Sequence, residues 1–123
     1  MSYVTDRKRV SGLGASGGGT DHHWKQMVSS IALLVLIPLF VFTFGAILGH
    51  PYEEVIAYYS RPIPAAIAAL TILVSFYHFK NGVRVLIEDY LRGGMRKGLI
   101  LATTILSYGA AGLGAFAVLR LAL

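Results

Sequence analysis

The sequence predicts an all-α membrane protein with three transmembrane helices and a polar N-terminal arm. The chain has 123 residues, which supports one domain at most. Hydrophobic residues make up 55% of it, only 14% are charged, and the mean hydropathy is +0.64. Three apolar stretches, at about 27–48, 63–90 and 98–121, are long enough to cross a hydrocarbon core of ~30 Å. We therefore expect a polar cytoplasmic arm over 1–26 and a three-helix domain over 27–123 that anchors the chain in the membrane.

Cysteine content and charge narrow the possible chemistry. The chain has no cysteine, which excludes disulfides, iron–sulfur clusters, thiolate zinc sites and covalently attached c-type haem within it. Its formal net charge is +5 at pH 7. These charges lie at the edges of the apolar stretches and not over a soluble surface, so they favour orientation in the bilayer over nucleic-acid binding.

The N-terminal arm is polar and rich in glycine. No apolar region follows the basic cluster 7–9 within the first 25 residues, so a cleavable signal peptide is not expected. Residues 12–17 match the dinucleotide pattern G-x-G-x-x-G, but no strand precedes them and no βαβ unit can follow. We expect a flexible arm that settles against a partner or the membrane surface.

The arm ends in His22, His23, Trp24 and Lys25, directly before the first apolar stretch. Adjacent histidines point apart on a helix, and no third ligand is close in sequence, so a metal site is disfavoured. Tryptophan and lysine prefer the level of the lipid headgroups. The segment is therefore interpreted as an interfacial anchor.

The first apolar stretch, 27–48, holds 22 residues without a charge. Pro38 is expected to kink this helix without ending it, since membrane helices tolerate proline. Ser29 and Ser30 lie near its start. Hydrogen bonding to their own helix backbone is the favoured interpretation, and contact with a quinone or a haem edge is the alternative.

A short loop over 49–61 follows. Its tyrosines fit an aromatic belt at the membrane interface, and they are Tyr52, Tyr58 and Tyr59.

The second helix begins near Pro62 and carries no charge over 63–79. It continues to about residue 90 if Lys80 and Arg84 extend towards the interface or face protein. Arg84 can pair with Glu88 four residues later, which leaves Asp89 as the carboxylate without an obvious partner. The central polar stretch of the chain therefore lies at the end of this helix.

His78, Gly82 and Asp89 share one face of the second helix. His78 and Asp89 are eleven positions apart, which at about 100° per residue is three turns plus roughly 20°. Gly82 falls about 40° from His78 and leaves space for a bulky group. Tyr90 follows Asp89 directly. One helix thus offers an imidazole, a gap beside it, and an acid and a phenol about 16 Å further along.

Two interpretations of His78 compete. Ionisable groups within a membrane segment are costly and are taken as functional by default. The imidazole can form a hydrogen bond across a helix interface, or it can be an axial ligand of haem iron, which requires its neutral form. This helix offers one buried histidine, so a haem held by His78 would lie at an interface with another chain.

The third stretch, 98–121, carries small residues at helical spacing. This pattern predicts close approach of another helix. Its members are Ser107, Ala110, Ala111, Gly114 and Ala115.

Positive charge sets the expected orientation. Lysine and arginine gather in the arm and in the loop between the second and third helices, whereas Arg61 and Arg120 are the only ones at the other side. The positive-inside rule then predicts a cytoplasmic or matrix N-terminus and a periplasmic or intermembrane C-terminus.

The pattern His-x3-Gly-x6-Asp-Tyr from His78 to Tyr90, in a three-helix chain of this length with an arm that ends in His-Trp, resembles the hydrophobic membrane-anchor subunits of succinate dehydrogenase, or respiratory complex II. The resemblance is to the smaller of the two anchors and implies a non-catalytic subunit. His78 would be one axial ligand of a b-type haem shared with the larger cytochrome b-type anchor. Gly82 would pack against that haem, and Asp89 and Tyr90 would line the ubiquinone site.

The resemblance also implies partners and a location. A flavoprotein and an iron–sulfur subunit would dock on the cytoplasmic or matrix side, and electrons would pass from succinate to ubiquinone in the tricarboxylic acid cycle. The membrane would be the bacterial inner membrane or the mitochondrial inner membrane. Members of the family often carry an arginine that contacts a haem propionate, and Met27 holds the matching position here. Lys25, His22 or His23 is the expected replacement.

Three alternatives stay open at this point. The chain can be a haem-free structural or assembly protein, in which His78 only bonds a neighbouring helix, and an optical spectrum separates this case. It can be a transporter or proton-channel subunit with a charged relay, although no inverted repeat supports this. It can also be a fumarate reductase anchor, which differs in physiological direction and quinone type.

Overall fold

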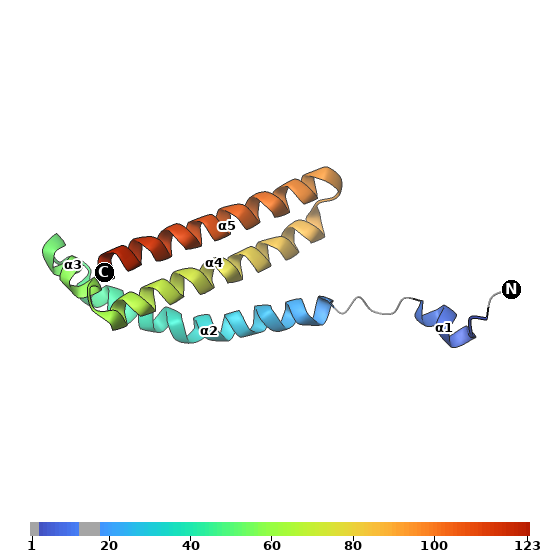
Figure 1. The fold of residues 1–123 in the computed structure, drawn as a ribbon, viewed down its shortest axis with the longest axis horizontal. Coiled ribbons are helices and arrows are strands. Elements are labelled where there is room, and N and C mark those ends of the chain that lie inside the picture. The colour runs from blue at the N-terminus through green and yellow to red at the C-terminus, as the bar shows by residue number, and fades with distance from the viewer. Residues whose placement is uncertain (1–2, 13–17) are drawn as a thin grey trace.

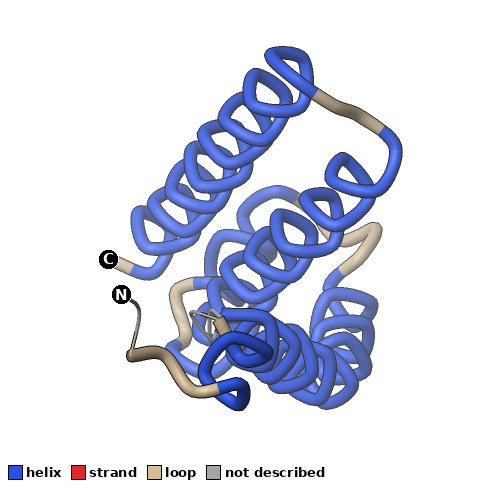
Figure 2. Tube along the Cα trace, turned by 90° about the vertical axis from the view of Figure 1, so that its right-hand side faces the viewer, coloured by secondary structure: helices blue, strands red, loops and turns tan. Residues whose placement is uncertain are grey.

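The computed structural model describes residues 3–12 and 18–123, and these form helices joined by short loops (Figures 1 and 2). No strand occurs in this part of the chain, which confirms the predicted all-α class. The helices are α1 (Asp6–Ser11), α2 (Gly18–Ile47), α3 (Tyr52–Tyr59), α4 (Pro62–Tyr90) and α5 (Gly93–Ala122).

The three long helices lie side by side with α4 in the middle (Figure 1). Helix α4 packs against both α2 and α5, whereas α2 and α5 do not pack against each other in the described chain. The polar stretch predicted from the sequence is therefore carried by the middle one of the three long helices. The start of α2, the end of α4 and the start of α5 lie at the same end of the molecule.

Among residues 3–12 and 18–123, three helices are long and apolar enough to cross a membrane, as predicted. The spans run over Thr20–Ile47, Pro62–Tyr90 and Gly93–Ala122. Most of their large apolar side chains are exposed on the single chain, which fits surfaces covered by lipid or by neighbouring proteins. The small buried cluster of Ile47, Tyr59 and Ala68 lies where α3 meets α2 and α4.

The first and third long helices begin earlier than expected. Helix α2 starts at Gly18, so residues 18–26 of the predicted arm belong to it, and Lys25 pairs with Asp21 at 3.1 Å across one turn. Helix α5 starts at Gly93, whose φ of +69° makes the tight turn after α4. Apolar runs mark the lipid-exposed part of a helix, while backbone hydrogen bonding continues beyond it.

The predicted loop 49–61 contains the short helix α3. Gly49 makes the turn with a φ of +84°, and the Tyr58 hydroxyl donates to the Thr43 carbonyl at 2.7 Å. Tyr59 is buried, whereas Tyr52 is exposed. The belt interpretation therefore fits Tyr52, and the other two tyrosines pack α3 onto the long helices.

The small residues of α5 bring it close to α4, as predicted. Ser107 and Ala111 are buried. A Cβ added at Gly114 would lie 2.8 Å from Cγ2 of Ile72, which is too close for an ordinary contact. Helix α2 runs unbroken through Pro38.

The arm contributes α1, which Thr5 caps by accepting a hydrogen bond from the Lys8 amide at 3.2 Å. Most of the G-x-G-x-x-G match, residues 13–17, lies outside the described residues.

Candidate functional site

His78 lies on α4 at its contact with α2 and is half-buried. Its Nδ1 is 2.9 Å from the Ser29 hydroxyl oxygen, and its Nε2 is 3.5 Å from Nε2 of Gln26. Both neighbours are uncharged, which suits a neutral imidazole. The interhelical hydrogen bond proposed for His78 is therefore present. It uses Nδ1, so it does not exclude a ligand at Nε2.

The space beside His78 is filled by the Gln26 amide. A Cβ added at Gly82 would lie 3.5 Å from Nε2 of Gln26, so this amide covers the glycine face predicted to be open. Oε1 of Gln26 is buried and has no hydrogen-bond partner among residues 3–12 and 18–123. The contact from its amide to His78 is long, and a weakly held amide can give way to a stronger partner.

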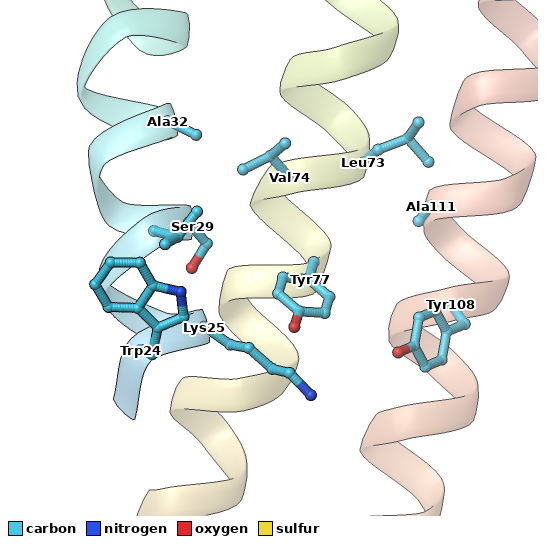
Figure 3. Close-up of a pocket in the computed structure, with 10 residues that line it drawn as sticks. Trp24, Lys25, Ser29, Ala32, Leu73, Val74, Tyr77, Tyr108 and Ala111 are labelled. Atoms are coloured by element: carbon cyan, nitrogen blue, oxygen red, sulfur yellow. The ribbon is translucent and has the colours of Figure 1, made fainter. Parts of the chain in front are cut away.

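An apolar pocket of about 490 Å³ lies next to Ser29, between α2 and the α4–α5 pair (Figure 3). Trp24 and Lys25 come from α2, Tyr77 from α4 and Tyr108 from α5, and Figure 3 shows Tyr77 between the other two helices. The pocket has an apolar wall and a polar rim, which is the usual character of a site for a large planar or chain-like ligand.

A polar pocket of about 470 Å³ adjoins it and shares Lys25 and Tyr77. Glu88 accepts from Arg84 at 2.9 Å, as predicted, and also lies 3.7 Å from Arg96 on α5. The other lining residues are Asp21, His22, Lys80 and Asn81. This pocket is therefore lined by several cations, part of whose charge is balanced by two carboxylates.

Asn81 and Lys80 line the polar pocket, and Asn81 was not singled out from the sequence. Asn81 is 5% exposed, and its Nδ2 has no hydrogen-bond partner in the described parts of the chain. Lys80 donates to the Tyr108 hydroxyl at 2.9 Å, and its ammonium lies 4.8 Å from the centre of that ring. Lys80 thus faces protein and links α4 to α5. Facing protein was one of the two arrangements expected to let this charged side chain lie within a membrane span.

Asp89 and Tyr90 point away from the rest of the chain at the end of α4. Tyr90 is 79% exposed, and Asp89 is also exposed. Neither lines a pocket described above, and Asp89 makes no ion pair with a described residue. The structure therefore does not join them to His78 in a cavity of this chain. Any pocket that uses them must be completed by other chains.

His22 and His23 lie in different surroundings, as predicted for adjacent residues on a helix. His22 lines the polar pocket, whereas His23 is exposed and lines none of the pockets described. No group of three histidine, cysteine or acidic side chains able to hold a metal ion occurs within the described residues. Met27 is 39% exposed.

The back-bonding expected of Ser29 and Ser30 is confirmed, because both hydroxyls donate to the Gln26 carbonyl at 2.9 Å. The contact from Ser29 to His78, and the place of Gln26 beside it, were missed. Ser29 and Gln26 are three residues apart and so share a helix face, but nothing local in the sequence indicates that this face meets His78.

Comparison with known proteins adds an independent observation. The family model described as "Succinate dehydrogenase/Fumarate reductase transmembrane subunit" matches residues 1–111. The chain is also similar to the succinate dehydrogenase hydrophobic membrane anchor subunit of Paracoccus denitrificans, with 41% identity over 123 residues. That alignment covers 100% of this chain and 95% of the relative. No solved structure shows significant similarity to the chain.

Proposed function

Since this chain belongs to the succinate dehydrogenase and fumarate reductase transmembrane subunit family, we propose that it combines membrane anchoring with the binding of haem b and ubiquinone. Its role as a membrane-anchor subunit of succinate dehydrogenase follows from the family and from its three apolar helices. The chain itself is non-catalytic. It contributes to the quinone site of an enzyme whose chemistry at succinate belongs to other subunits.

His78 carries the haem assignment. It is a half-buried imidazole in a membrane span with no charged partner among the described residues. The neighbour of its Nε2 is the Gln26 amide, at 3.5 Å. The unpaired Oε1 of Gln26, and the face of Gly82 that only this amide covers, fit a position where a large flat group replaces the amide. A bound haem b supplies one-electron redox chemistry at this point. His78 would hold the haem iron from this chain, and a residue of the larger anchor subunit would hold it from the other side of the interface.

In this proposal Lys25 and His22 hold the haem propionates. They take the role of the arginine that family members often carry at the position of Met27. Both line the polar pocket and lie within four residues before Gln26, whereas His23 is exposed and lines none of the pockets described. Changing Lys25 or His22 to alanine is expected to lower the haem retained by the purified complex about three- to tenfold, the cost of one or two charge-assisted hydrogen bonds weakened by exposure. The haem-to-flavin ratio measures this, with His23→Ala as the matched control. Equal retention in all three variants would contradict the propionate assignment.

Tyr90 and Asp89 form this chain's part of the ubiquinone site. Their exposure at the end of α4 supports a pocket shared with neighbouring subunits. The Tyr90 hydroxyl donates a hydrogen bond to a quinone carbonyl oxygen as negative charge develops on that atom. Asp89, which has no partner among the described residues, orients Tyr90 or relays protons to the quinone.

The end of the molecule that carries Asp89 and Tyr90 faces the cytoplasm or matrix. Arg92, Arg96 and Lys97 lie there, beside the start of α2, whereas Arg61 and Arg120 lie at the other end. Under the positive-inside rule this end is the one on which the iron–sulfur and flavoprotein subunits dock. A quinone bound there is within reach of electrons from the iron–sulfur subunit.

Isolation of the complex through a tag on this chain tests the proposed function. The flavoprotein, the iron–sulfur subunit and the larger anchor are expected to co-purify in equal amounts after mild detergent extraction. A chain that is extracted intact and folded from membranes that contain all three, yet brings none of them, would contradict it.

A further inference from the structure

Among the described residues, Ser29 makes the shortest side-chain contact with the ring nitrogens of His78. The two side chains come from different helices, 49 positions apart, and their oxygen and Nδ1 lie 2.9 Å from each other. Ser29 is only 4% exposed, so water does not compete for the bond. In Figure 3 its hydroxyl oxygen lies on the side of α2 that faces α4.

The contacts of the Ser29 hydroxyl point to one direction for this bond. The Ser29 hydroxyl has one hydrogen, and its oxygen is 2.9 Å from the Gln26 carbonyl, which can only accept. The hydroxyl therefore donates to that carbonyl and presents a lone pair to His78. It follows that Nδ1 of His78 carries a hydrogen and donates it to Ser29. In a neutral imidazole the other nitrogen, Nε2, then has the free lone pair.

The neighbour of Nε2 agrees with this assignment. Nε2 of Gln26, at 3.5 Å, is a donor and cannot accept. A protonated Nε2 would face another donor there, while an unprotonated one meets a weak donor. The contact at Nε2 is therefore compatible with the tautomer that the Ser29 bond assigns.

We propose that Ser29 is a positioning residue that fixes the tautomer and orientation of His78, so that Nε2 is the nitrogen offered to haem iron. This inference rests on the proposed haem-binding function. A histidine ligand usually donates its second N–H to a nearby acceptor, which orients the ring and makes the ligand nitrogen more basic. Ser29 is that acceptor, and the Gln26 carbonyl in turn holds its hydroxyl in place.

Ser30 provides a matched control. It makes the same bond to the Gln26 carbonyl at 2.9 Å, but it is exposed and does not touch His78. Any effect of losing a serine hydroxyl on α2 itself is therefore shared by both positions. An effect specific to Ser29 must come through His78.

The test compares Ser29→Ala, Ser29→Thr and Ser30→Ala in the assembled complex. A less basic ligand favours ferrous haem, so Ser29→Ala is expected to raise the haem midpoint potential, by up to about 59 mV if the balance between the two states changes tenfold. It is also expected to weaken haem retention about tenfold. Ser29→Thr keeps a hydroxyl and should restore both values, and Ser30→Ala should leave both unchanged.

The possible results distinguish the role of Ser29 from the haem binding on which it rests. A Ser29→Ala complex with the potential and haem retention of Ser30→Ala would overturn the role of Ser29 while leaving haem binding intact. If Ser29→Ala does not assemble, Ser29→Val and Ser29→Thr have the same shape and differ in the hydroxyl, so equal potentials in that pair would overturn it as well. A wild-type complex without haem would overturn the proposed function, and this inference with it.

Discussion

Replacing His78 with alanine is expected to abolish the low-spin, six-coordinate state of the haem in the assembled complex. Under the proposed ligation, one ligand from the larger anchor would remain, and the iron would become five-coordinate or the haem would dissociate. Because axial ligands set haem potentials over a range of about 0.8 V, any retained haem should shift by about 100 mV or more. Electron paramagnetic resonance measures the spin state, and a redox titration measures the potential.

His50→Ala is the control for this prediction. His50 pairs with Glu54 at 2.7 Å. The pair lies near α3, at the opposite end of the molecule and outside the three candidate membrane spans. Its loss should leave the haem unchanged. A His78→Ala complex with a low-spin haem at the wild-type potential would show that the ligand comes from elsewhere.

Changing Tyr90 to phenylalanine is expected to reduce ubiquinone reduction about 10- to 100-fold, the range for one hydrogen bond to a charged group at about 1.5–3 kcal/mol. Succinate oxidation with an artificial electron acceptor should stay largely intact, since that reaction bypasses the quinone. Both rates are measured on the same purified complex. The reason is geometric, because Tyr90 is 79% exposed and its hydroxyl is free to meet a ligand held by partner subunits.

Tyr52→Phe is the matched control for Tyr90. Tyr52 is similarly exposed, at 74%, but lies on α3 at the other end of the molecule. It should affect neither rate. Equal loss of both activities in Tyr90→Phe would point to damaged assembly and against a role at the quinone.

The membrane spans were predictable because each is a long apolar run, and all three are confirmed. Their ends were less predictable. Lys25 and Asp21 ended the apolar pattern but not the helix, since their ion pair stabilises the same turn that their charge marks as polar. The short helix α3 was missed because eight residues between prolines and glycines give little periodic pattern.

In the candidate site, contacts within one helix could be predicted from the sequence, whereas contacts between helices could not. The pairing of Arg84 with Glu88 and the shared face of His78 and Gly82 follow from spacing along one helix. The approach of Ser29 to His78 depends on which helix lies beside α4 and at what height. That register is set by packing between α2 and α4, and no local pattern in α2 predicts it.

The reduced-minus-oxidised optical spectrum of the complex, purified through this chain, tests most directly whether the His78 imidazole binds haem iron. The account predicts a b-type haem spectrum in the wild type and its loss or displacement in His78→Ala. A wild-type complex that contains the flavoprotein and the iron–sulfur subunit but gives no haem spectrum would contradict it, as would an identical spectrum in the variant.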